Sequence, residues 1–163
     1  MLEYMDNNTF PEKSYDLIFS VTGGFSYVDD EELLKINEKL KQYLKDDRKM
    51  ILAHLNYFCL PEMIYMTLKM QNPFYRLKTK LKVNIKNEEH TMHLRSSGKL
   101  KKIYHQHFIH LKLYPLLAFT PPYQTHFKPG LRLLDTFRKT ERKLLNKPWI
   151  SKIADQIVVV CKK

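Results

Sequence analysis

The stretch Tyr15-Asp16-Leu17-Ile18-Phe19-Ser20-Val21 decides the fold class, because it is short, apolar and rich in residues that favour β-strands. It follows Phe10-Pro11 and precedes Thr22-Gly23-Gly24, so residues typical of turns flank it on both sides. A continuous apolar run of this length between turn signals predicts a strand that is buried on both faces of a sheet.

The residues that follow predict a helix and a second strand. Apolar residues recur every three or four positions from Leu33 to Leu44, with acidic residues in front and lysines behind. This pattern predicts an amphipathic helix that is capped by Asp29 or Asp30. The run from Met50 to Leu55 predicts the next strand. Strand, helix and strand with short connections indicate a right-handed crossover unit of a parallel sheet, and therefore an α/β fold.

The patterns are weaker in the rest of the chain, whose 163 residues fit one domain. Residues 62–81 predict an interrupted helix, and residues 90–112 alternate as in a strand or hairpin. The prolines of 115–129 predict a loop. Residues 131–145 predict a helix that faces inward with Leu133, Leu134, Phe137, Leu144 and Leu145. Residues 156–161 predict a buried closing strand.

The charge is unevenly distributed along the chain. The first 60 residues hold 11 acidic and 7 basic side chains, whereas residues 61–163 hold 6 acidic and 21 basic ones. Such a basic half favours polyanions or anionic lipid surfaces, although a lysine excess also simply keeps proteins in solution. No run approaches the roughly 18 apolar residues that a spanning helix needs, and the acidic start is unlike a secretory signal. We therefore expect no transmembrane segment and a cytoplasmic protein.

Metal chemistry is not expected from the cysteines or the histidines. Cys59 and Cys161 are far apart and match neither a disulfide framework nor a zinc site. His105, His107 and His110 would have to share one face of a strand, but the third is out of phase and has no carboxylate nearby.

Several segments form a pattern when they are taken together: Asp6-Asn7, Phe10-Pro11, Ser14 to Ser20, Phe25 to Asp30, Leu34 to Lys41, Lys49 to Leu55 and Ile153 to Lys163. The segments within the first 60 residues resemble the middle of class I S-adenosylmethionine-dependent methyltransferases, and the last segment resembles the closing strand of that family. The resemblance implies a partial Rossmann-like methyltransferase sheet, with equivalents of strands four to seven and C-terminal cap elements. Residues 1–163 would form a single partial domain, in which residues 57–130 are a variable substrate cap.

The sequence also departs from the family pattern. It supplies neither the glycine-rich loop after strand one nor the acidic residue that ends strand two. Lys45-Asp46-Asp47 replaces the usual Pro-Gly-Gly turn. Residues 17–21 would then form an unpaired apolar edge. We therefore expect either the C-terminal part of a longer, truncated protein or a chain that completes its sheet with another polypeptide, and we do not expect independent catalysis.

The resemblance implies S-adenosylmethionine as the cofactor. The residues implied for binding it are Asp6, Asn7, Ser20, Val21, Thr22 and Gly23. Asp6 and Asn7 would flank the adenine, and the alternative for Asp6 is a solvated turn. The others lie at the carboxyl end of the first strand, where open α/β sheets bind ligands, and the alternative for the glycines is an ordinary turn.

The acceptor side of the site would lie at the end of the second strand. His54 and Asn56 would touch the acceptor, and Tyr27 and Tyr57 would line the entrance of the same site. His54 has an intrinsic pKa suited to a catalytic base. Alternatively, His54 caps the strand through a backbone hydrogen bond, and the two tyrosines are core aromatics.

The sequence thus predicts a methyltransferase for a small-molecule or glycan-like acceptor. The alternative is a non-catalytic basic interaction module, derived from the same fold, that binds a partner chain, nucleic acid or an anionic surface. The basic, aromatic-rich residues 76–112 fit either a polyanion groove or a lid over a small-molecule pocket. Nucleic-acid binding would depend steeply on salt.

Overall fold

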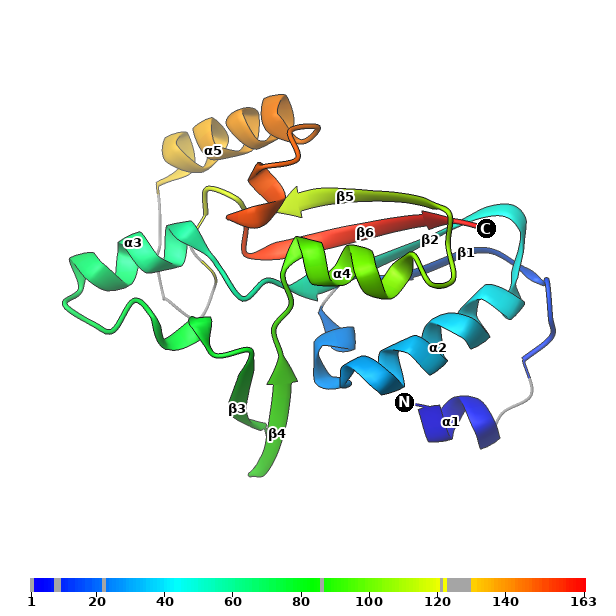
Figure 1. The fold of residues 1–163 in the computed structure, drawn as a ribbon. Coiled ribbons are helices and arrows are strands. Elements are labelled where there is room, and N and C mark those ends of the chain that lie inside the picture. The colour runs from blue at the N-terminus through cyan, green and yellow to red at the C-terminus, as the bar shows by residue number, and fades with distance from the viewer. Residues whose placement is uncertain (1, 8–9, 22, 86, 121, 123–129) are drawn as a thin grey trace.

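A mixed four-stranded sheet forms the centre of the computed structural model (Figure 1). The structure describes residues 2–7, 10–21, 23–85, 87–120, 122 and 130–163. The strands of the sheet, in spatial order, are β1 (Tyr15–Ser20), β2 (Leu44–Leu55), β6 (Gln156–Lys162) and β5 (His110–Leu116). β1 and β2 run parallel, and β6 runs antiparallel to both of its neighbours.

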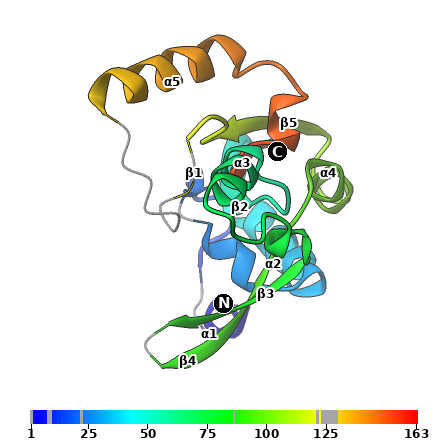
Figure 2. The same ribbon diagram turned by 90° about the vertical axis from the view of Figure 1, so that its left-hand side faces the viewer.

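The helices lie mainly on one side and at one end of this sheet (Figures 1 and 2). The α-helices are α1 (Leu2–Asn7), α2 (Asp30–Tyr43), α3 (Leu60–Leu68), α4 (Ser97–Tyr104) and α5 (Leu131–Leu144). The short 3-10 helices are η1 (Gly24–Tyr27), η2 (Tyr75–Leu77) and η4 (Ile150–Lys152). A separate hairpin, β3 (Lys80–Ile85) with β4 (Glu88–His93), projects away from the sheet.

The predicted strand–helix–strand unit is confirmed as β1–α2–β2. The side chain of Asp29 accepts a hydrogen bond of 2.8 Å from the backbone N–H of Glu32 and so caps α2. Leu33 and Ile36 of α2 are fully buried. The fold class expected from the sequence is therefore correct at the level of an α/β fold with a mixed sheet.

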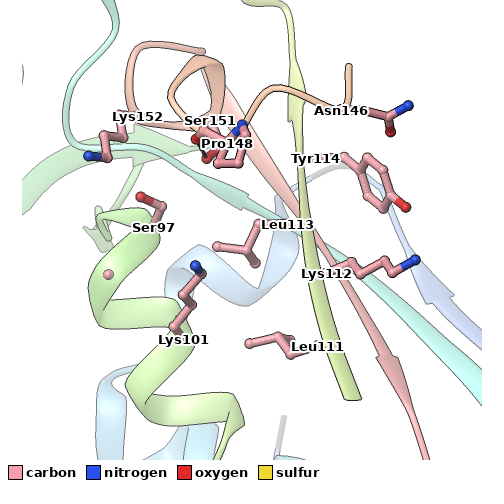
Figure 3. A pocket seen from close by; sticks show the side chains of 11 residues that line it. Ser97, Lys101, Leu111, Lys112, Leu113, Tyr114, Asn146, Pro148, Ser151 and Lys152 are labelled. Carbon is pink, nitrogen blue, oxygen red and sulfur yellow. Dashed lines mark hydrogen bonds between the residues drawn. The ribbon is translucent and has the colours of Figure 1, made fainter. Parts of the chain in front are cut away.

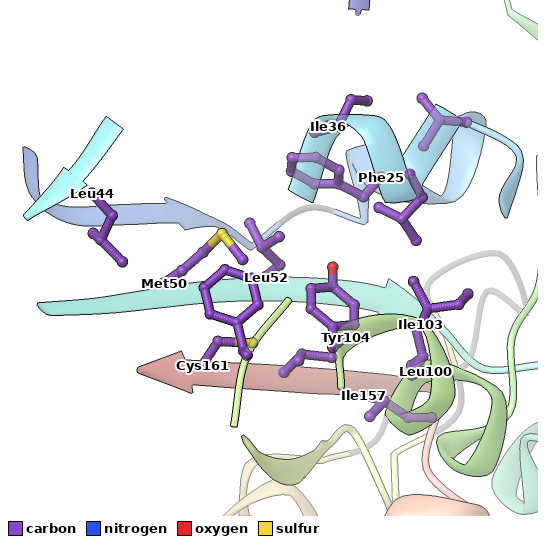
Figure 4. Close-up of a cluster of buried hydrophobic side chains, with 14 of the residues drawn as sticks. Phe25, Ile36, Leu44, Met50, Leu52, Leu100, Ile103, Tyr104, Ile157 and Cys161 are labelled. Atoms are coloured by element: carbon purple, nitrogen blue, oxygen red, sulfur yellow. The ribbon is translucent and has the colours of Figure 1, made fainter. Parts of the chain in front are cut away.

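The main core lies between the sheet and the pair α2 and α4 (Figure 4). Alternate residues of the central strands face this layer, as the two-residue period of a strand requires. They are Met50 and Leu52 from β2 and Ile157, Val159 and Cys161 from β6, and none is more than 1% exposed. α4 contributes Leu100, Ile103 and Tyr104 to the same cluster.

The described residues leave the opposite face of the sheet partly open, most of all along β1. Leu17 and Phe19 of β1 are 48% and 65% exposed, so the prediction that this strand is buried on both faces is wrong. The reason is that β1 is an edge strand, which among the described residues pairs only with β2, and the helices α2 and α4 cover one face only. The apolar run indicates a strand suited to burial, but the described residues do not bury it.

The same open face carries a row of basic residues at one end. Lys49, Lys162 and His110 are aligned by strand pairing across β2, β6 and β5. With Lys112, Tyr114 and Val160 they line an open groove of about 400 Å³. The face is therefore apolar toward β1 and basic toward β5.

Residues 90–112 differ in part from the prediction. A strand is confirmed at both ends of this range, in β4 and β5, but residues 97–104 form the helix α4 instead. The Ser96 hydroxyl caps α4 by accepting a 3.2 Å hydrogen bond from the N–H of Lys99. Among the described residues of the expected cap, α4 and β5 belong to the core and the sheet. α3, η2 and the β3–β4 hairpin lie outside these layers (Figure 1).

The C-terminal predictions fare better. α5 and β6 form where a helix and a closing strand were predicted, and β6 is central and buried on alternate residues. The residues of α5 that were predicted to face inward are at most partly buried, however, and Leu133 is 42% exposed. No helix of the described residues is long and apolar enough to span a membrane.

The one-sided cover of the sheet predicts unequal costs for two matched substitutions. Leu52→Ala should lower the free energy of unfolding by about 2–5 kcal/mol, because Leu52 is 1% exposed. Leu17→Ala, in the neighbouring strand, should cost less than about 1 kcal/mol, because that side chain is half exposed. Urea denaturation of both variants measures the difference. Equal losses would contradict an open outer face.

Candidate functional site

The carboxyl ends of β1 and β2 lie side by side and form the candidate site. The parallel register places Ser20 beside Leu52, so the segments that follow each strand emerge at the same edge of the sheet. Open α/β sheets bind ligands at such an edge. Of the residues predicted for the cofactor, Ser20, Val21 and Gly23 lie here, whereas Thr22 lies outside the described residues.

The loop after β1 requires glycine at position 23. Gly23 has a φ of +71°, in the left-handed region that other residues adopt only at a cost. A Cβ atom there would lie 3.4 Å from Cγ of Leu55, so the loop passes close to the end of β2.

Ser26 fastens this loop to the second strand. Its N–H donates to the carbonyl of Gly23 over 2.8 Å, and its hydroxyl accepts a 3.0 Å hydrogen bond from the N–H of Leu55. Ser26 is fully buried, so both interactions are shielded from water.

Arg95 holds the other end of the loop. No motif in the sequence marks this residue as part of a site. Its side chain is fully buried, and Nε donates to Oδ1 of Asp30 over 2.8 Å. Its Nη1 donates to the carbonyl of Phe25 over 3.0 Å, and Nη2 donates to the carbonyl of Val28. One guanidinium thus ties the loop to the start of α2.

Asp30 is held in its charged form by this arrangement. Partial burial alone would raise its pKa, but hydrogen bonds from Lys99 and Arg95, together with their positive charges, hold the pKa below its usual value. Lys99 extends from α4, so the ion pair also joins α4 to the start of α2.

His54 lies in the core. Its ring is fully buried, and Nε2 is 2.6 Å from the hydroxyl of Tyr104. Burial and the nearby charge of Arg95 lower the pKa of His54 to about 3. Because the ring is enclosed and neutral, the geometry favours a structural role over that of a base. The partner is a side-chain hydroxyl rather than the backbone group of the alternative interpretation.

The other residues expected to touch the acceptor fall into two groups. Asn56 is fully buried, and its Nδ2 donates to three carbonyls in and after η4, those of Ser151, Lys152 and Ala154. It therefore joins the end of β2 to the segment before β6.

Tyr27 is 39% exposed and packs edge-on against His90, with ring centroids 6.3 Å apart, so it faces the β3–β4 hairpin. Tyr57 is partly buried beside Phe58.

Asp6 and Asn7 are not brought to this edge. Both belong to α1, which lies beside α2 on the side away from the sheet (Figures 1 and 2). Met5 anchors α1 in the core cluster. Their contact with adenine stays a prediction.

A buried cluster at the root of α3 contains Cys59, Glu62 and Asp155, whose potential ligand atoms lie within 4.8 Å of one another. Arg76 pairs with both carboxylates, and its Nη1 is 2.6 Å from Oδ1 of Asp155. Burial raises the pKa of the Cys59 thiol to about 12. Because the guanidinium already supplies the positive charge, the cluster joins η2 and α3 to the start of β6 as an ion-pair network.

A pocket of about 460 Å³ lies between α4 and β5 (Figure 3). Lys101 projects from α4 toward Leu111 and Leu113, and Lys152 lies at the far end. The pocket contains none of the residues predicted for cofactor or acceptor.

Known structures share this fold. No protein-family model and no curated protein matches the chain. A SAM-dependent methyltransferase from Archaeoglobus fulgidus aligns with 99% of this chain and 64% of its own, at 15% identity and a TM-score of 0.50. One from Thermotoga maritima, described as a possible histamine N-methyltransferase, aligns with 97% and 61%, at 15% identity and a TM-score of 0.52. One from Clostridium acetobutylicum aligns with 95% and 61%, at 11% identity and a TM-score of 0.51.

These comparisons establish the fold. The resemblance inferred from the first 60 residues extends, in structure, across nearly the whole chain. The chain spans less than two thirds of the length of each of these three proteins. At such identities the likeness concerns the architecture, which is methyltransferase-like.

Removal of the Arg95 guanidinium should loosen the loop and destabilise the fold. Arg95→Met would leave the buried carbonyls of Phe25 and Val28 without their donor, so we expect a loss of about 3 kcal/mol or more. Arg48→Met is the matched control, because Arg48 pairs with Asp16 at the surface and should cost less than about 1 kcal/mol. Urea denaturation measures both losses, and hydrogen exchange at the amide of Ser26 reports on the loop. An unchanged exchange rate at Ser26 would contradict the assigned role.

The buried, neutral His54 predicts a specific acid sensitivity. The folded pKa of about 3 lies below the unfolded value near 6.5, so only the unfolded chain binds the proton between these values. Stability should therefore fall as the pH drops from about 6 to about 4, by up to about 1.4 kcal/mol per pH unit from this group. His54→Gln should remove this part of the slope. Equal slopes in both proteins, measured by urea denaturation across this range, would contradict the prediction.

Proposed function

We propose that this chain works as part of an S-adenosylmethionine-dependent methyltransferase. The observation that carries the proposal is the likeness in fold to three such enzymes over 95–99% of the chain. In this proposal β1, β2, β5 and β6 are the equivalents of strands four to seven, and the remaining strands come from outside the 163 residues, in the same polypeptide or in another one.

The open edge of β1 supports the need for further strands. An apolar edge with exposed backbone groups is a template for pairing and is rarely left uncovered. Val21, directly after β1, is 52% exposed, and Leu17 and Phe19 within β1 are 48% and 65% exposed. A parallel strand added at this edge would pair the free side of β1, and a helix added with it would cover the apolar part of the open face.

The donor would lie against Ser20 to Gly24. Methyl transfer depends on holding the sulfonium and the acceptor in line at about 3 Å, so a rigid wall matters more than a reactive side chain. The loop has that character, because Ser26 and Arg95 fix its two halves through buried hydrogen bonds. Asp6 and Asn7 contribute to the adenine end of the site only if α1 is repositioned when the sheet is complete.

The acceptor would enter between the loop after β1 and the β3–β4 hairpin. Tyr27 and His90 meet at this boundary, and both remain partly open to solvent. A small molecule with a nucleophilic nitrogen, oxygen or carbon fits such an entrance. With His54 enclosed, the acceptor either arrives deprotonated or loses its proton to a group outside the core.

Calorimetry with S-adenosylhomocysteine tests the proposal. The protein is purified under native conditions from its own cells, so that whatever completes the sheet is retained, and we expect saturable heat. Gly23→Ala should weaken binding by roughly tenfold, because an L-residue at a φ of +71° carries about 1–2 kcal/mol of strain that displaces the loop. Gly98→Ala is the matched control, since a Cβ at Gly98 meets nothing within 4 Å.

Two outcomes would contradict the proposal. If no heat is measured at millimolar S-adenosylhomocysteine, the protein does not bind the methyl donor. Equal affinities of the Gly23→Ala and Gly98→Ala proteins would show that the donor binds elsewhere.

A further inference from the structure

α5 separates charged and apolar residues on two faces more completely than α2, α3 or α4. Its five basic side chains outnumber its two acidic ones. The basic residues are all exposed, and they are Arg132, Arg138, Lys139, Arg142 and Lys143. Asp135 is paired with Lys139 at 2.7 Å, and Glu141 accepts a hydrogen bond from the N–H of Phe119. The outer face of the helix is therefore strongly positive.

The apolar face of α5, formed by Leu133, Leu134, Phe137 and Leu144, is only partly covered by the described residues. Leu144 packs against the cluster of Ala118, Ile150 and Ala154, Phe137 lies beside α3, and Leu133 is 42% exposed. In Figures 1 and 2 the helix lies beside the sheet rather than upon it. Exposure of apolar side chains to water is unfavourable, so we expect a further surface to cover the apolar face of this helix.

α3 presents a second apolar face next to the first. Ile64 and Leu68 are 53% and 78% exposed, and Met70, just beyond the helix, is 98% exposed. Phe137 of α5 and residues of α3 line one common groove of about 230 Å³. Its lining is apolar throughout and consists of Leu60, Pro61, Ile64, Tyr65, Leu68, Phe119 and Phe137. The two helices thus form one docking surface, which we call the α3–α5 surface.

The charges around the α3–α5 surface identify its occupant. Arg132 lies in the first turn of α5, and the other four basic residues lie between Arg138 and Lys143, in the second half of a helix about 20 Å long. Basic side chains at both ends of the helix can contact separate negative charges of one surface. Helices with a basic polar face and a leucine- and phenylalanine-rich apolar face lie in the headgroup region of membranes, with the apolar face toward the acyl chains.

We propose that the α3–α5 surface docks this protein on an anionic phospholipid bilayer. The basic residues of α5 contact the headgroups, and Leu133, Leu68 and Met70 enter the boundary with the acyl chains. With 14 residues, α5 is suited to lying along the bilayer rather than spanning it. The proposal does not depend on methyl transfer and stands or falls separately from it.

Vesicle flotation in a density gradient tests the docking. Flotation is preferable to pelleting, because the open edge of β1 could produce aggregates that also sediment. The protein should float with vesicles of phosphatidylcholine and phosphatidylserine but not with vesicles of phosphatidylcholine alone. Binding should weaken as salt is added, because ions screen the attraction between exposed charges.

Two charge-reversed variants distinguish binding through the α3–α5 surface from binding through the positive charge of the whole protein. Arg142→Glu with Lys143→Glu changes the last turn of α5, and Lys101→Glu with Lys102→Glu makes the same change in the last turn of α4. Both alter the net charge equally and disturb a helix end alike. We expect the first to reduce the floated fraction by on the order of tenfold or more, and the second to leave it nearly unchanged.

The apolar contribution has its own test. Leu68→Ser with Leu133→Ser should also reduce flotation on anionic vesicles, and because both side chains are exposed, thermal unfolding should change little. Three results would overturn the proposal: no flotation of the unaltered protein with anionic vesicles, equal losses in the α4 and α5 charge variants, or a dimer that is abolished by the leucine substitutions while vesicles are ignored. The last result would assign the surface to a second copy of the chain.

Discussion

The parallel pairing of β1 with β2 is the constraint on which the rest of this structure depends. It aligns Ile18 with Met50 and Ser20 with Leu52, so both strands end at the same edge of the sheet. The connection between them must then cross one face, and α2 does so while burying Leu33 against the sheet. The loop after β1 and the segment after β2 are neighbours for this reason alone.

Buried polar side chains turn that edge into a rigid wall. Loops that leave a sheet carry backbone groups with no ladder partner, and such groups are costly when they are buried. Arg95 supplies several donors from one planar group and satisfies the carbonyls of Phe25 and Val28. Asn56 does the same for the segment before β6. The loop is thereby ordered without regular structure of its own, which is the property that a ligand-positioning wall requires.

The sequence predicts the elements whose signals are local and fails where partners are distant. The β1–α2–β2 unit follows from apolar spacing and the Asp29 cap, which involve neighbouring residues only. The helix α4 was not predicted, because residues 101–108 alternate like a strand. Arg95 could not be found, since its partners lie 65 to 70 residues away in the chain. The environment of His54 depends in the same way on Tyr104, 50 residues further on.

The edge of β1 and the α3–α5 surface are suited to different partners. Among the described residues, the free side of β1 carries a row of backbone groups without a strand partner, which another strand can pair, and the exposed Phe19 beside them favours an apolar covering layer. α5 has its backbone groups satisfied within the helix and offers side chains alone, apolar on one face and basic on the other. The first surface therefore demands a partner of defined register, whereas the second accepts a fluid surface that has charge but no register. Because β1 and α5 lie on opposite sides of β2 and β6, the sheet can be completed at one edge without covering the other surface (Figure 1).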